Sequence, residues 1–159
     1  MAAERRPGHV FLSYVREDSE RVDRLQRALE AEDVPVWRDI GSLWPGQDWK
    51  LEIADAIGHG SFAFLACFSE HSAARGRSYQ NEELVLAVEQ MRLRRPGQPW
   101  LIPVRFAPVA LPAFPLGAGR LLSDLHGVDL FGGDDEVRVG RLVGAVKSIL
   151  LAQAATAND

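Results

Sequence analysis

A single stretch of the chain constrains the fold more than any other. Residues 62–68 are apolar without interruption, preceded by Gly58 and Gly60 and followed by Ser69. A half-exposed strand alternates apolar and polar residues, so a stretch that is apolar on both faces predicts a central strand of a parallel sheet. It is far shorter than the roughly 20 residues that a membrane-spanning helix needs. We therefore expect a protein built around a buried strand at 61–68.

Short apolar segments alternate with longer amphipathic ones along the rest of the chain. Val22, Leu25 and Leu29, for example, follow the spacing of one helix face. Repeated strand–helix alternation predicts an α/β protein with a five-stranded parallel sheet and helices on both faces, in three layers. Strands are expected at 9–14, 34–37, 61–68, 99–106 and 125–130, and helices from Asp18 or Ser19, from Asp48 to Gly58 and Gly60, at 78–94 and at 134–154, whereas 69–77 and 107–123 are expected to be irregular.

Length and composition limit the classes of protein that remain. The chain has 159 residues, a net charge of −4 and 47% hydrophobic residues. This excludes bulk disorder and argues against direct binding to nucleic acid or to a membrane surface. Cys67 is the single cysteine, so a disulfide or a cysteine zinc cluster within the chain is excluded and a cytoplasmic location is expected. We expect one domain at 9–153, a disordered segment at 1–8 and a tail at 154–159.

In an open parallel sheet, ligands bind beyond the carboxyl ends of the strands, so function is expected in the loops after residues 14, 37, 68 and 106. Several site types are excluded. The chain has no phosphate-binding G-x-x-x-x-G-K-[ST] motif, and its glycine pair, Gly58 and Gly60, precedes a strand instead of following one. The four histidines lack the spacing of metal ligands, so no metal site is expected.

Two segments remain as candidates. The loop at 38–47 holds Trp44 beside Pro45-Gly46, where the indole can either stack on a ligand or a neighbouring subunit, or pack in the core. The second segment begins at Ser78, where Tyr79 and Glu83 share one face of a helix. A carboxylate beside an aromatic ring can stabilise a cationic sugar transition state. Alternatively, the acidic residues only complement the helix dipole.

The motifs, taken in order, resemble those of the TIR (Toll/interleukin-1 receptor-like) domain, in particular of its bacterial members. The resemblance covers about residues 9–131, and it rests on five motifs in register instead of on any single one. The matching segments are 9–14 with Glu17-Asp18, 36–39 with Leu43 and Pro45-Gly46, Ala56-Ile57 continuing through Ser61 to 68–69, Tyr79-x-x-x-Glu83-Leu84, and 100–105.

The resemblance implies a flavodoxin-like fold and, as in many bacterial members, cleavage of the nicotinamide–ribose bond of NAD⁺ to give nicotinamide and ADP-ribose or a cyclic product. NAD⁺ is then the substrate, and neither a cofactor nor a metal is implied. The glutamate of the family corresponds to Glu83, which is the implied catalytic residue. The implied substrate-binding residues are Ser13, Tyr14, Trp37, Asp39, Trp44 and Tyr79.

The family also implies partners. The expected partners are NAD⁺, other TIR domains in a homo-oligomer or filament, and a separate or fused sensor domain, with a role as a bacterial defence or signalling effector activated by self-association. The alternative is a non-catalytic module, a scaffold or host mimic, that binds other TIR domains through the loop at 38–47 and the adjacent helices. Trp44 stands where some active members carry an acid, and Val15-Arg16 where some carry two basic residues. The choice between hydrolysis and cyclisation therefore stays open.

Overall fold

The computed structural model describes residues 8–38, 46, 48–95 and 97–157. The expected disordered segment at 1–8 lies outside this range apart from Gly8. Within these ranges, five strands form one parallel sheet, as predicted, and their order is β2-β1-β3-β4-β7. They are β1 (His9–Ser13), β2 (Val36–Trp37), β3 (Ser61–Phe68), β4 (Leu101–Arg105) and β7 (Val128–Asp129).

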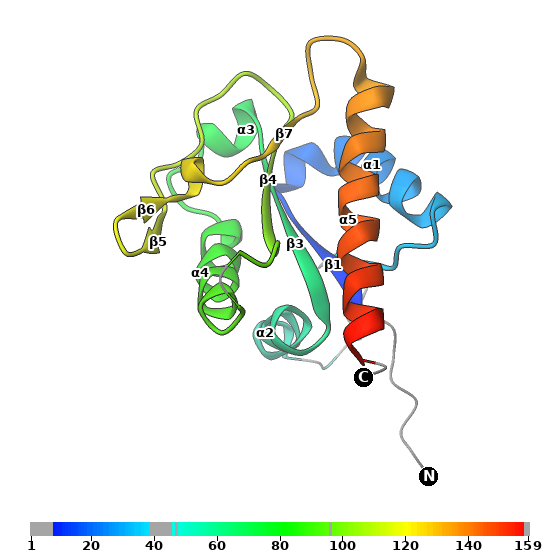
Figure 1. Ribbon diagram of the computed structural model, residues 1–159. Coiled ribbons are helices and arrows are strands. Elements are labelled where there is room, and N and C mark those ends of the chain that lie inside the picture. The colour runs from blue at the N-terminus through cyan, green and yellow to red at the C-terminus, as the bar shows by residue number, and fades with distance from the viewer. Residues whose placement is uncertain (1–7, 39–45, 47, 96, 158–159) are drawn as a thin grey trace.

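The sheet is the middle of three layers (Figure 1). Helices α1 (Ser19–Ala31) and α5 (Asp135–Ala157) cover one face, and α2 (Trp49–His59) and α4 (Tyr79–Arg92) cover the other. Among the described helices, none is both long and apolar enough to cross a membrane. The arrangement confirms the predicted fold class, with the strand order typical of flavodoxin-like sheets.

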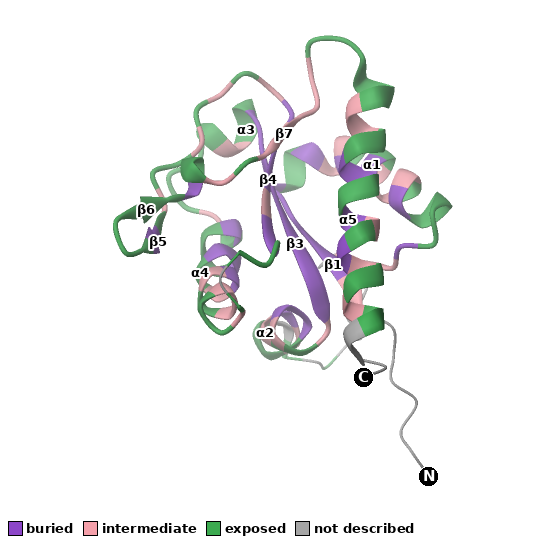
Figure 2. Cartoon of the chain, viewed as in Figure 1, coloured by how far each residue is buried: buried purple, intermediate pink, exposed green. Residues whose placement is uncertain are grey.

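Strand β3 lies at the centre, and all eight of its residues are buried (Figure 2). Its side chains alternate between two separate hydrophobic clusters. Leu65 and Cys67 point toward α1 and α5, whereas Phe64, Ala66 and Phe68 point toward α2 and α4. The continuous apolar stretch is thus explained by one strand that serves two cores.

Helix starts follow the predicted residues, although not always by the predicted contacts. Asp48 caps α2, because its carboxylate accepts hydrogen bonds from the backbone N–H groups of Lys50 and Leu51. Ser78 precedes α4 and Asp18 precedes α1, but neither side chain makes a capping hydrogen bond. Asp18 is instead buried, where it accepts hydrogen bonds from Ser69 Oγ and from Arg21.

Three connections hold more structure than the sequence predicts. The short helix α3 (Glu70–Ala73) follows β3, and the 3-10 turn η1 (Arg16–Asp18) precedes α1. The connection at 107–123 contains an antiparallel hairpin, β5 (Pro115–Gly117) and β6 (Arg120–Leu121), followed by the 3-10 turn η2 (Leu122–Asp124). Positive φ angles at Gly117, Ala118 and Gly119 turn the chain between the two hairpin strands. Helix α5 also runs three residues beyond its predicted end.

Candidate active site

Glu83 lies in the second turn of α4 and faces the carboxyl end of β1. Its side chain is buried, with 4% of the residue exposed. Ser13, the last residue of β1, donates a hydrogen bond from Oγ to Glu83 Oε1 over 2.8 Å. Ser13 can reach this carboxylate because alternation along β1 places it on the same sheet face as Phe11, the face covered by α2 and α4. The hydroxyl therefore orients an acidic group inside the fold.

A groove of about 360 Å³ lies between α2 and α4 and includes Glu83 in its lining. Aliphatic side chains form much of its wall, and Lys50 and Glu82 add charge of both signs. The lining residues are Lys50, Ile53, Ala54, Tyr79, Glu82, Glu83, Val85 and Leu86. A concave, largely apolar site with a few polar groups is the usual form of a small-molecule site.

Tyr79 and Glu83 line the same groove, as their spacing along a helix predicts. Tyr79 is the first residue of α4, and 62% of the residue is exposed where it lines the groove. Glu82 is exposed in the first turn, where it also complements the helix dipole. Interaction with the helix dipole does not by itself explain the position of Glu83, because its carboxylate is buried and hydrogen-bonded to Ser13.

Gln80 is a member of the site that the sequence reasoning missed. Its residue is 4% exposed, and its amide Nε2 donates to the backbone carbonyls of Ser13, over 3.2 Å, and Cys67, over 2.7 Å. A signal was present: Gln80 stands one and two turns before Leu84 and Ala87, both buried in the core. A polar residue on the buried stripe of a helix indicates a side chain with partners inside the fold.

A sequence match that runs from β1 into α5 identifies the family of the chain. The family model described as "TIR domain" matches residues 10–143, which is well over half of the chain. The chain belongs to the TIR domain family. A search among curated proteins finds no match.

Solved structures share the fold of this TIR domain. The TIR domain of the Toll-related receptor TRR-2 from Hydra magnipapillata has a TM-score of 0.64 at 20% identity, over 88% of this chain and 96% of that one. The TIR domains of the activated Roq1 resistosome, which recognises the effector XopQ, give 0.65 at 20%, over 87% and 99%. A TIR-STING receptor from C. gigas, solved with 2′,3′-cGAMP, gives 0.63 at 20%, over 91% of this chain but 41% of that one.

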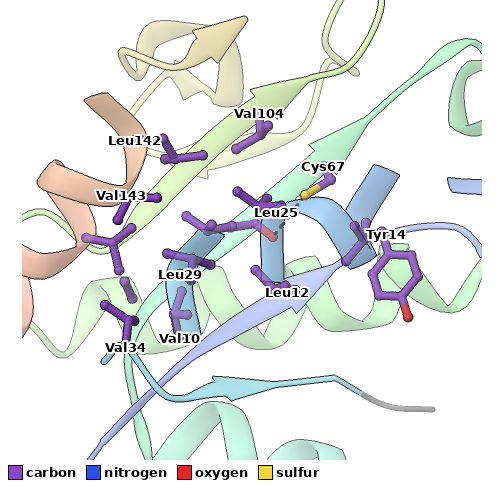
Figure 3. Packing of buried hydrophobic residues seen from close by; sticks show 14 of the residues in the cluster. Val10, Leu12, Tyr14, Leu25, Leu29, Val34, Cys67, Val104, Leu142 and Val143 are labelled. Carbon is purple, nitrogen blue, oxygen red and sulfur yellow. Dashed lines mark hydrogen bonds between the residues drawn. The ribbon is translucent and has the colours of Figure 1, made fainter. Parts of the chain in front are cut away.

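Tyr14 lies on the other side of the TIR sheet from Glu83. It is buried in the cluster beneath α1 and α5, next to β1 residue Leu12 (Figure 3). Its hydroxyl accepts hydrogen bonds from Nε and Nη2 of Arg38, over 3.1 and 2.9 Å. Consecutive residues of an extended chain point to opposite faces, so Ser13 and Tyr14 enter different layers. The structure does not bring Tyr14 together with Glu83.

Trp37 lies on the same sheet face as Ser13. It is half-buried, and its ring stacks on Phe11 with 4.9 Å between ring centroids. Its packing role is therefore visible, and contact with a substrate stays a prediction. Asp39 and Trp44, the other two predicted substrate-binding residues, lie outside the described residues.

Two further groups near the carboxyl ends of the strands, the Cys67 thiol and the Asp18 carboxylate, are buried. Burial raises the pKa of the Cys67 thiol, so the thiol stays protonated in the core instead of acting as a nucleophile. The buried carboxylate of Asp18 is occupied by Ser69 and Arg21. In the described part of the chain, no three His, Cys, Asp or Glu side chains gather as a metal site would require.

Proposed function

We propose that this TIR domain cleaves NAD⁺ at the bond between nicotinamide and ribose, with Glu83 as the catalytic residue. The observation that carries the proposal is a buried carboxylate, oriented by Ser13, in the lining of a groove large enough for a small molecule. The resemblance of the Tyr79-x-x-x-Glu83-Leu84 segment to the motif of NAD⁺-cleaving TIR domains supports the same assignment.

In the proposed reaction, a carboxylate supplies the stabilising charge, and no metal ion is required. The C1′–N bond breaks with its electron pair passing to the pyridinium nitrogen, so nicotinamide leaves neutral and the ribose becomes an oxocarbenium ion. The negative charge of Glu83 stabilises this cation at short range. Water then adds to C1′ and releases a proton, which gives ADP-ribose. Addition of a nucleophile from the adenosine half instead gives a cyclic product.

Other groove residues suit the rest of the substrate. Tyr79, a largely exposed residue of the groove lining, can stack its ring on the nicotinamide or the ribose. Lys50 supplies a positive charge that suits the diphosphate. We assign Ser13 an orienting role, because its hydroxyl binds the catalytic carboxylate.

The test is incubation with NAD⁺ and chromatographic separation of nicotinamide, ADP-ribose and cyclic products. We expect Glu83→Gln to keep the fold, since the amide oxygen still accepts from Ser13, and to lower turnover by about 100-fold or more, the scale for removing one preorganised electrostatic group. Glu89→Gln is the matched control, because Glu89 is exposed on the same helix and absent from the groove lining. Equal turnover in the two variants would overturn the role of Glu83.

We further propose that this TIR domain acts in bacterial defence or signalling and that turnover depends on self-association. Turnover per molecule should then rise with protein concentration. If the wild-type protein releases no nicotinamide at any concentration, the enzyme assignment fails and the alternative, a TIR–TIR interaction module, is left.

A further inference from the structure

The strand order of the sheet reverses direction between β1 and β3. These neighbours are the strands from which the chain continues in opposite directions, to β2 on one side and to β4 on the other. In open parallel sheets, ligands commonly bind at the carboxyl ends of such a strand pair. The connections leave in opposite directions there, and the backbone carbonyls that end the two strands need hydrogen-bond partners.

In this chain, a side chain of α4 takes that position. The Gln80 amide nitrogen carries two hydrogens, and it donates to Ser13 O at the end of β1 and to Cys67 O near the end of β3. Gln80 is as deeply buried as Glu83. One amide group thus bridges the ends of the two strands, while the carboxylate of Glu83 lies in the lining of the groove between α2 and α4.

Ser13 is hydrogen-bonded to two side chains of the same helix, Gln80 and Glu83. Its backbone carbonyl accepts from Gln80, its hydroxyl donates to Glu83, and one turn of α4 links these two side chains. We propose that Gln80 is a positioning residue that sets the place of Glu83 relative to the substrate. This inference rests on the proposed NAD⁺ cleavage, in which a displacement of about 1 Å can cost about 100-fold in rate.

The experiment compares Gln80→Leu with Val146→Ala. Leucine keeps much of the size of glutamine and removes both donors. Val146 is fully buried on α5, across the sheet from Glu83, so Val146→Ala reports what a general loss of stability does to turnover. Both variants are assayed well below their melting temperatures. We expect kcat of Gln80→Leu to fall by 10-fold or more with KM within threefold of wild type, and kcat of Val146→Ala to stay near wild type.

A second measurement separates this inference from the proposed function. Hydrogen exchange of peptides that cover residues 79–84 should become faster in Gln80→Leu and stay unchanged relative to the rest of the protein in Val146→Ala. Wild-type kcat in Gln80→Leu, an equal fall of kcat in both variants, or unchanged exchange at 79–84 would each overturn the inference. If the wild type releases no nicotinamide, the proposed function fails, and the exchange measurement alone decides whether Gln80 holds α4.

Discussion

Ser13 and Tyr14 are neighbours in the sequence, but their side chains lie on opposite faces of the sheet. The sequence places both in one motif, and the resemblance assigns both to the substrate. In the structure Ser13 binds Glu83, whereas Tyr14 accepts hydrogen bonds from Arg38 on the opposite side of the sheet. A motif lists residues in chain order and does not by itself say which layer each one enters. Contact between Tyr14 and a substrate stays a prediction.

His9 makes a prediction about pH at the residue scale. Its Nε2 lies 3.0 Å from the carbonyl oxygen of Ala56 and 2.9 Å from Ser61 Oγ. Burial lowers the pKa of His9 below its usual value, and the hydrogen bond to Ala56 only partly opposes this. The folded state therefore prefers the neutral ring. Because the unfolded chain binds a proton first as the pH falls below about 6.5, His9 lowers stability progressively below that pH.

Urea unfolding of wild type and His9→Gln at pH 7.5, 6.5 and 5.5 tests this. Glutamine can still donate to Ala56 but does not titrate, and all other groups are common to both proteins. We expect the free energy of unfolding of wild type to fall relative to that of the variant as the pH is lowered. A constant difference between the two proteins would contradict the prediction.

The residues of the candidate site were predictable to different degrees. Helical spacing placed Tyr79 and Glu83 on one groove, because that spacing depends only on local geometry. The partnership of Glu83 with Ser13 joins residues far apart in the chain, so no local pattern could give it. Gln80 was missed although its place on the buried stripe of α4 was a signal, because its partners are backbone carbonyls, which no particular residue type identifies.

At the scale of elements, the sequence predicted what depends on hydrophobic pattern and missed what depends on pairing. Strand β3 matches its predicted bounds, because the apolar residues mark both of its ends. Strands β2 and β7 are two residues each, shorter than predicted, since their length is set by how far they pair with β1 and β4. The hairpin β5–β6 was missed because prolines and glycines mask its weak strand pattern.

The cap of α2 provides a prediction at this scale. Asp48 accepts hydrogen bonds from Lys50 N and Leu51 N, over 3.1 and 3.4 Å. Asp48→Ala removes these acceptors from the helix start, and we expect a loss of about 1 kcal/mol in the free energy of unfolding. Asp48→Asn keeps the side-chain oxygen and is the matched control, so a much smaller loss is expected. Equal losses in urea unfolding would show that the cap is not the cause.

At the scale of the whole molecule, two glycines should respond in opposite ways to the same substitution. A Cβ atom on Gly127 would lie 2.6 Å from the carbonyl oxygen of Pro103 in β4, so Gly127→Ala must push β7 away from the sheet. We expect this to cost about 1–3 kcal/mol of stability, as overpacking usually does. A Cβ on Gly140, exposed on α5, meets no atom within 4 Å.

Gly140→Ala should therefore stabilise the protein by about 0.5–1 kcal/mol, because alanine restricts the unfolded chain and favours the helix. Thermal unfolding of both variants checks the pair. A melting temperature of Gly127→Ala at or above that of wild type would contradict the close packing of β7 on β4.

The central position of β3 also affects how the protein is made. Val10 pairs with Ala63, and Phe64 pairs with Leu101, so each edge of β3 pairs with a strand that is distant in the chain. Such pairing makes folding slower than in a helical protein of similar length. On the ribosome, β3 emerges when β1 is already available and β4 is not. Its second edge, on the most apolar strand, stays open to other chains until residues 101–105 have been synthesised.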